Sequence, residues 1–398
     1  MNKNNDFAHL VSRRGNLEHP WSTVTPPPEG LISFTGGIPD PATLPLEELS
    51  VAAKKTFSNR GVDSLQYAGS AGDIRLRSLI AERITSIQEV QSSPENVVLT
   101  NGSSQALDIV CAAFIDEGDV VLSETPTFTG SLWTMRSHGA QIFPINIGKD
   151  GFDTSSLESS LEDLKAEGVT AKFIYLTPDF QNPTGIRMDL TTRKKIVGLA
   201  RQYGTFIVED TAYSELVLDG PSLPSLFSLG PDSVVQMSTF SKIIGPGLRL
   251  GWLTGAPPIV HSSTWARTDM GSSVTTSNIV AQFIEDGFLD PHINKMKNVY
   301  RNKRDTFDRV LNEMLHGIVS WNTPEGGFFF WLTANENVDV KLLLEEARNS
   351  GIAFAPGFRF NVESDTPSQG IRLAFSEVST ENIPEGISRL SKAIQKFT

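Results

Sequence analysis

A lysine follows a short apolar stretch in the segment Ser238–Trp252, which reads STFSKIIGPGLRLGW. Hydroxyl side chains stand three and one residues before Lys242, and an arginine stands seven residues after it. An amine in this setting can bind a phosphate group through its charge, or react with an aldehyde to form a Schiff base. Most lysines are solvated loop residues, but the position of Lys242 between a predicted strand and a Gly-Pro-Gly turn favours a chemical role.

A second segment, Asn101–Ala106, has the composition of a phosphate-binding turn. It follows the apolar stretch Val97–Thr100 and carries a glycine and two serines at the start of a predicted helix. Free N–H groups at a helix start and nearby hydroxyls bind phosphate well. Because a serine in this place is usually only a helix cap, the turn is ambiguous when it is taken alone.

Two further segments carry polar residues at the ends of predicted strands. Glu209 and Asp210 end one strand and Tyr213 follows. Since neighbouring strand residues point to opposite faces, only one of the two carboxylates can face a ligand at the sheet edge. The other segment, Thr177–Gly185, ends in Asn-Pro-Thr-Gly, which most often is simply a turn.

Taken together and in this order, the four segments resemble the pyridoxal-phosphate-dependent aminotransferases of class I and II, which have the aspartate aminotransferase fold (fold type I). The stretches Phe34–Asp40 and Gln66–Gly72 add to the likeness. The resemblance runs from about Ile32 to the C-terminus. It is strongest to the subgroup of 2-aminoadipate and kynurenine aminotransferases and the catalytic half of the MocR-type regulators.

This resemblance implies three catalytic residues, Lys242, Asp210 and Tyr213. Lys242 joins the cofactor aldehyde through its amine and later moves a proton between the substrate and the cofactor. Asp210 keeps the pyridine nitrogen protonated, which makes the ring an electron sink. Tyr213 and Asn182 hydrogen-bond the ring oxygen, and Phe128 stacks on the ring in a position where the family often has tyrosine.

The resemblance also assigns the remaining contacts. Phosphate ligands are implied at Ser103, Ser104, Thr239, Ser241 and Arg249, together with Tyr67 from a second subunit, which predicts a homodimer with shared sites.

Substrate contacts are implied at Arg372, which grips the α-carboxylate as a fork, at Gly37 and at Asn182. The alternatives are a surface ion pair for Arg372 and an ordinary turn for Gly37. The residues that read the substrate side chain stay open, with Arg13, Arg14 and Phe328–Trp331 as candidates.

Short apolar runs rich in β-branched residues predict the strands that position these residues. They lie at 97–100, 120–123, 173–177, 206–209, 234–238 and 250–254. Helical patterns separate several of them, such as 191–203, which ends before Gly204. We therefore expect an α/β fold with a mostly parallel sheet covered by helices, and by resemblance a sheet of the seven-stranded type.

The chain divides into three predicted parts: residues 1–59 as an N-terminal arm and part of a small domain, 60–290 as the large cofactor-binding domain, and 291–398 as the small α+β domain. The first fifty residues are rich in proline, so we expect little structure there. A long helical pattern follows Asp290, a plausible N-cap.

Composition excludes several function classes. With 34 Lys+Arg against 46 Asp+Glu, the net charge is −12, which argues against a nucleic-acid partner. One cysteine, Cys111, and six scattered histidines give no metal-site spacing. The polar N-terminus and the lack of any stretch approaching ~18 apolar residues predict a cytoplasmic protein with no membrane contact.

The predicted function is transfer of the amino group of an L-amino acid to a 2-oxo acid by a ping-pong mechanism. Elimination, cyclisation or another reaction through the same α-carbanion stays open, and a non-catalytic sensor like the MocR-type regulators is a further alternative. A dehydrogenase is rejected because Gly245, Gly247 and Gly251 have the wrong spacing for a dinucleotide fingerprint. An S-x-x-K acyl enzyme is rejected because Thr239 stands three before Lys242.

Overall fold

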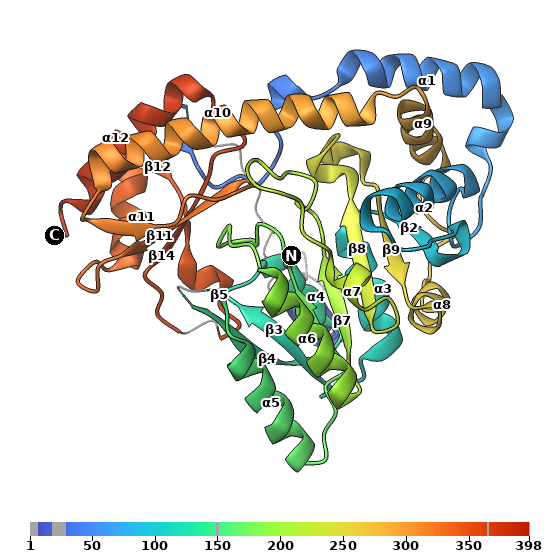
Figure 1. Ribbon diagram of the computed structural model, residues 1–398. Helices are drawn as coiled ribbons and strands as arrows, with labels where there is room; N and C mark the ends of the chain where they lie inside the picture. Colours follow the sequence, from blue (N-terminus) through green and yellow to red (C-terminus); the bar gives the residue numbers. More distant parts are fainter. Residues whose placement is uncertain (1–6, 18–28, 149–150, 364–365, 398) are drawn as a thin grey trace, which may run out of the picture.

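The structure is a computed structural model that describes residues 7–17, 29–148, 151–363 and 366–397. Its described part contains one eight-stranded sheet, in the order β2-β9-β8-β7-β6-β3-β4-β5 (Figure 1). Strands β4, β3, β6, β7 and β8 run parallel, whereas β9 and β5 are antiparallel to their neighbours. The strands are β2 (Val97–Thr100), β3 (Val120–Thr125), β4 (Gln141–Gly148), β5 (Gly151–Phe152), β6 (Phe173–Leu176), β7 (Phe206–Asp210), β8 (Val234–Thr239) and β9 (Gly251–Gly255).

All six strands predicted from the apolar runs are present, with ends that differ by at most two residues. Strands β4 and β5 were not predicted. Most of β4 is partly exposed and it contains Pro144, so it lacks the continuous apolar run of a buried strand. The sheet exceeds the expected seven strands because the two-residue β5 pairs with this edge.

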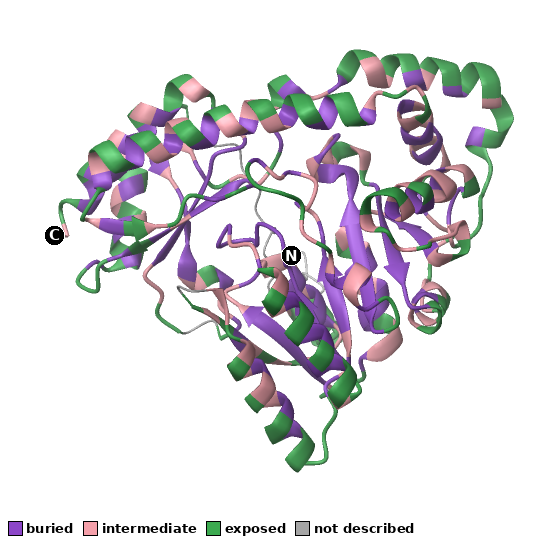
Figure 2. Cartoon of the chain, in the orientation of Figure 1, coloured by how far each residue is buried: buried purple, intermediate pink, exposed green. Residues whose placement is uncertain are grey.

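Helices cover both faces of the sheet, so its strands other than β4 and β5 are mostly buried (Figure 2). On one face α3, α4 and α8 pack against alternate strand residues such as Tyr175, Val208 and Met237. On the other, residues such as Ile174 and Ile207 join a larger apolar cluster with α2, α5, α6 and α9. The helices are α2 (Ile74–Gln88), α3 (Ser103–Phe114), α4 (Thr129–Ser137), α5 (Thr154–Ala166), α6 (Leu190–Tyr203), α7 (Leu226–Leu229), α8 (Pro257–Trp265) and α9 (Val274–Glu285).

The C-terminal part forms a second, four-stranded antiparallel sheet in the order β10-β11-β14-β13. The short strand β1 (Ile32–Ser33) pairs with β12 (Ile352–Ala353), which joins the N-terminal segment to this part of the molecule. The 27-residue α10 runs along both parts (Figure 1). The elements are β10 (Val319–Trp321), β11 (Phe329–Ala334), β13 (Ala355–Pro356), β14 (Gly370–Ala374), α10 (Leu289–Leu315), α11 (Val340–Asn349) and α12 (Ile383–Ile394).

The prediction of Asp290 as a helix N-cap was wrong. Helix α10 begins at Leu289 after the cap residue Phe288, so Asp290 lies in its first turn, where it pairs with Arg83 at 2.8 Å. Among the described residues of the first fifty, there are only short 3-10 turns, the two-residue strand β1 and the start of α1 (Leu46–Arg60), which agrees with the little structure expected there. In the described ranges, no helix combines the length and apolar character needed to cross a membrane.

Candidate active site

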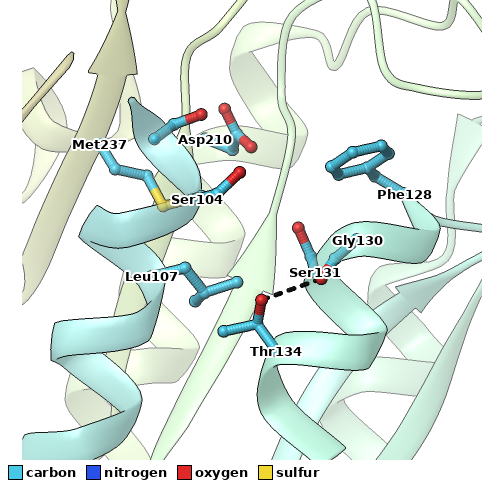
Figure 3. Close-up of a pocket in the computed structure, with 9 residues that line it drawn as sticks. Ser104, Leu107, Phe128, Gly130, Ser131, Thr134, Asp210 and Met237 are labelled. Atoms are coloured by element: carbon cyan, nitrogen blue, oxygen red, sulfur yellow. Dashed lines mark hydrogen bonds between the residues drawn. The ribbon is translucent and has the colours of Figure 1, made fainter. Parts of the chain in front are cut away.

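A pocket of about 210 Å³ opens where β7 and β8 end, between the starts of α3 and α4. In Figure 3, Asp210, Ser104, Phe128 and Ser131 surround the same space. The complete lining is Ser103, Ser104, Leu107, Phe128, Gly130, Ser131, Thr134, Asp210 and Met237. Four residues that the sequence analysis assigned to the cofactor therefore meet in one pocket, namely Ser103, Ser104, Phe128 and Asp210. They come from three separate segments of the chain.

Asp210 is the carboxylate that faces this pocket, as strand alternation requires. Glu209 points to the other face, where it accepts hydrogen bonds from the N–H groups of Leu226 (2.7 Å) and Phe227 (3.1 Å). One oxygen of Asp210 accepts a hydrogen bond from the N–H of Ala212 at 3.1 Å. Burial raises the pKa of Asp210, while the Ala212 N–H, the Tyr175 hydroxyl and the charge of Lys242 oppose this rise.

Lys242 lies in the short 3-10 turn after β8, where its Nζ donates a hydrogen bond to the carbonyl of Gly37 at 2.7 Å. Burial lowers the pKa of Lys242 to about 8, opposed by Asp210 and reinforced by Arg372 and Arg249. A larger fraction of this amine is therefore neutral near pH 7 than for an ordinary lysine, and only the neutral amine is a nucleophile or a base.

Gly37 comes close to two of these residues. A Cβ atom at Gly37 would lie 2.6 Å from the ring of Phe329 and 3.8 Å from the hydroxyl of Tyr213. A side chain at this position would therefore clash with the buried ring of Phe329, which favours glycine here.

Hydrogen-bond donors suited to a phosphate group lie near the start of α3. Arg249 adopts the left-handed conformation, with φ of 47°, and its guanidinium lies 3.1 Å from the position of a Cβ on Gly102. Nearby, the hydroxyls of Thr239 and Ser241 are 2.8 Å apart. A helix start, serine and threonine hydroxyls and one guanidinium together fit a dianion.

Arg372 projects from β14 and is only 8% exposed. Its Nη1 donates to Asn182 Oδ1 at 2.7 Å and its Nη2 to the carbonyl of Thr35 at 2.6 Å. The guanidinium lies 4.5 Å from the ring of Phe329 and 4.8 Å from that of Phe360. Among the described residues no carboxylate pairs with Arg372, and its Nε is buried without a hydrogen-bond partner.

This environment shifts the pKa of Arg372 and of its neighbour Tyr213, but both side chains keep their usual charge near pH 7. Burial lowers the pKa of Arg372 to about 10. Burial also raises the pKa of Tyr213, which hydrogen-bonds Asn182 and lies with its ring 5.7 Å from Lys242 Nζ. The arginine side chain is therefore not the surface ion pair that was its alternative interpretation, but a buried positive group with spare donor capacity.

Three of the remaining candidates lie away from the pocket. Tyr67 is 80% exposed, on the loop between α1 and α2. Arg13 donates to main-chain carbonyls at the end of α4, and Arg14 pairs with Asp108 at 3.0 Å. Neither arginine lines the pocket. Phe329, from the other candidate stretch for substrate recognition, does not line it either, but its ring contacts the guanidinium of Arg372.

Sequence reasoning missed Tyr175 and Ser131. Tyr175 Oη donates to Asp210 at 3.0 Å, and Ser131 Oγ donates to Tyr175 Oη at 2.8 Å. Tyr175 stands in the apolar stretch FIYL of β6, where an aromatic residue is indistinguishable from ordinary core. The signal that would have found it is the two-residue alternation that places it on the same face as Asp210 of the neighbouring strand.

Comparison with known proteins agrees with this geometry. The sequence profile of the family described as "Aminotransferase class I and II" matches residues 31–390. The chain is 34% identical to aromatic-amino-acid aminotransferase 1 of Thermococcus litoralis, over 92% of this chain and 88% of that protein. It is 33% identical to 2-aminoadipate transaminase of Thermus thermophilus, over 92% of this chain and 90% of that protein.

Solved structures give the same result. The crystal structure of Pyrococcus horikoshii kynurenine aminotransferase, described as a complex with PMP, superposes with a TM-score of 0.92 at 30% identity, covering 98% of each chain. The alpha-aminoadipate aminotransferase of Thermus thermophilus, complexed with N-(5'-phosphopyridoxyl)-L-leucine, gives a TM-score of 0.85 at 31% identity, covering 93% of each chain.

Proposed function

The chain belongs to the class I and II aminotransferases, a family whose members use pyridoxal phosphate to move the amino group of an amino acid to a 2-oxo acid, and from this premise we propose how its residues carry out the reaction. The expected fold type, cofactor and reaction class are thereby confirmed. The roles of the single residues, the sharing of sites between subunits and the choice of substrate are proposals.

The residues around the pocket fit the cofactor. When bound, pyridoxal phosphate supplies an aldehyde that condenses with amines and a pyridine ring that withdraws electrons. We assign its phosphate to the start of α3 and the donors Ser103, Ser104, Thr239, Ser241 and Arg249. Asp210 and Phe128 line the pocket, where Asp210 would hold the proton of the ring nitrogen and Phe128 would cover the ring face. Asn182 and Tyr213, which interact with each other, would hydrogen-bond the ring oxygen.

One observation carries the assignment of the substrate. Arg372 is a buried cation without a carboxylate partner among the described residues, and it lies near a second cation, Lys242. Burying an unpaired charge is costly, so the protein gains from an anion at this place. A planar guanidinium with a free Nε–H matches a carboxylate in a two-bond fork, which fits the α-carboxylate of an amino acid.

Lys242 is the group that moves the proton. Its lowered pKa, about 8, makes the neutral amine available as a base near physiological pH. The carbonyl of Gly37 holds its Nζ on the side of Arg372 and Tyr213, where the bound carboxylate places the substrate α-carbon.

The substrate side chain meets aromatic surface in this proposal. Phe329 and Phe360 flank the guanidinium of Arg372, and Trp331 packs edge-on against Phe360 with ring centroids 6.3 Å apart. Together with the names of the relatives, this supports a substrate with an aromatic or long side chain, with an amino-acid panel as the test.

The experiment that tests the function is a half-reaction. With an amino acid and no oxo acid, we expect one stoichiometric conversion of the cofactor to its amine form, and an added 2-oxo acid should return it to the aldehyde form. Absorption spectra and product mass follow both steps. Repeated release of ammonia or a cyclised product would instead support elimination or cyclisation, and no conversion with any of the twenty amino acids would support a sensor.

We further propose that two copies share their sites through Tyr67. This side chain is 80% exposed, and Val62 and Leu65 of the same segment are exposed apolar residues. The exposed residues Trp265 and Met270 flank Arg267, whose Nη1 donates to the carbonyl of Ser70 at 2.8 Å, so the two segments adjoin. Such a concentration of apolar surface is typical of a protein interface.

Mixed dimers test this sharing. A Tyr67→Asp subunit paired with a Lys242→Ala subunit should regain about half of the activity of the unmodified dimer, because one site then carries both changes and the other carries none. In the control, Asp210→Asn paired with Lys242→Ala should stay inactive. Both residues of a site come from the same subunit, so each of the two sites carries one of the changes. Equal inactivity of both mixtures in confirmed heterodimers would disprove the shared site.

The cytoplasmic location expected from the sequence stays part of the proposal, with fractionation of producing cells as its test. Within the described ranges, no three His, Cys, Asp or Glu side chains are grouped to hold a metal ion.

A further inference from the structure

We propose that Tyr175 and Ser131 form a chain of two hydroxyl donors that holds Asp210 in its carboxylate form and in a fixed orientation. Tyr175 is thus a positioning residue that acts on the cofactor through Asp210. The inference rests on the proposed role of Asp210 at the ring nitrogen.

The register of the sheet brings the two side chains together. Tyr175 of β6 is the neighbour of Val208 on β7, and Asp210 stands two residues beyond Val208 on the same face. The phenol spans this offset, and its Oη donates to Asp210 Oδ2 at 3.0 Å. The other oxygen, Oδ1, accepts from the N–H of Ala212, so each oxygen of the carboxylate has one donor.

Ser131, on helix α4, provides the other hydroxyl of this chain. It stands near the start of α4 and lines the pocket, and its Oγ donates to Tyr175 Oη at 2.8 Å. Because Tyr175 is fully buried, its hydroxyl needs both an acceptor and a donor, and these two contacts supply them. Burial and the nearby charge of Asp210 raise the pKa of Tyr175 well above its ordinary value, so the phenol keeps the proton that it donates.

The surroundings explain why Asp210 needs this support. Burial favours the neutral acid, and a protonated Asp210 would no longer stabilise positive charge on a ring nitrogen. The charged or titratable groups that act on it are Lys242, which favours the carboxylate, and Glu124, Tyr213 and Tyr175. Burial raises the pKa of Glu124 to about 8, so Glu124 adds little negative charge at neutral pH.

A purely apolar core would not require these hydroxyls. The other side chains on this face include Phe173, Val208 and Met237, and phenylalanine would fill the volume of Tyr175 without needing partners. The hydroxyl chain ends at the one carboxylate that faces the pocket, which indicates a role in setting its charge.

The test measures Asp210 directly, in the cofactor-free protein. Carboxyl carbons of ¹³C-labelled aspartate are titrated by NMR, and the Asp210 signal is identified by its loss in Asp210→Asn. In Tyr175→Phe, loss of a hydrogen bond to a charged group should raise the titration midpoint of Asp210 by about one to two pH units. Ser131→Ala should raise it by less, since the phenol remains.

Tyr203→Phe is the control, because that ring lies at the end of α6 and should leave the midpoint unchanged. An unchanged midpoint in both Tyr175→Phe and Ser131→Ala overturns the inference. If Tyr175→Phe does not fold, the Ser131→Ala midpoint decides alone. No turnover is needed, so failure of the half-reaction described above would reject the proposed function and leave this result standing.

In the enzyme with bound cofactor, the raised midpoint of Asp210 in Tyr175→Phe should move the acidic limb of the kcat–pH profile to higher pH. The sign follows from the carboxylate form being the active one: a raised midpoint means that a higher pH is needed to ionise Asp210. An unmoved acidic limb in Tyr175→Phe would contradict the inference.

Discussion

Lys242→Ala should lower the rate of amino transfer by about 10⁴-fold or more while the protein stays folded, because the variant loses both the nucleophile and the base. The amine of Lys242 lies between the carbonyl of Gly37 and the ring of Tyr213, and its lowered pKa, about 8, suits both tasks. Neither Asp210 nor Arg372 carries a free amine that could replace it in forming a Schiff base.

The measurement combines kinetics with chemical mapping. Borohydride reduction of the loaded wild-type protein followed by mass spectrometry of its peptides should place the cofactor on Lys242, and the variant should carry no label. Lys54→Ala, at an exposed position of α1, is the control for loss of a lysine without loss of function. A label on another lysine in the wild-type protein would disprove the assignment.

The second large effect is expected at Arg372. Arg372→Ala should lower kcat/KM for amino acids by about 10²- to 10³-fold, because it removes a buried, charge-assisted contact to the α-carboxylate. The guanidinium already donates to Asn182 and Thr35, and its unpartnered Nε indicates the missing anion. An amine substrate without a carboxylate should lose much less.

Two further variants separate binding from packing, since Phe329 and Phe360 contact the guanidinium. Arg372→Met keeps much of the volume and removes the charge. It should lose as much activity as Arg372→Ala without lowering the melting temperature, because a buried unpaired cation contributes little to stability. Arg372→Lys should recover only part of the activity, since it cannot form the fork. Equal losses with both substrate types would show that Arg372 is structural.

The sequence predicted the strands of the sheet because a parallel strand buried on both faces is nearly all apolar. Val97–Thr100 and Val234–Thr239 are fully buried, and both were found from their composition. Strand β4 has a single buried residue and contains a proline, and β5 has two residues, so neither carries such a signal. The domain division after residues 59 and 290 stays a prediction.

The catalytic residues were predicted from the family resemblance that the four segments carry together. Asp210 is the last residue of β7, and Lys242 and the serines at the start of α3 come a few residues after β8 and β2, so all lie where the ends of neighbouring strands meet at one edge. The sequence also determined that Asp210 and Glu209 face opposite ways, because that follows from strand alternation alone. Their individual roles remain proposals until the experiments above are done.

The tertiary structure decided which polar groups are paired and which are not. Arg372 and Asn182 are 190 residues apart in sequence, and only the folded chain shows their contact and the missing acidic partner. Tyr175 was not recognised from its own segment, because its hydroxyl matters only through Ser131 and Asp210, which come from α4 and β7. Local periodicity reports burial and direction, whereas hydrogen-bond partners and protonation depend on contacts between distant segments, and these exist only after folding.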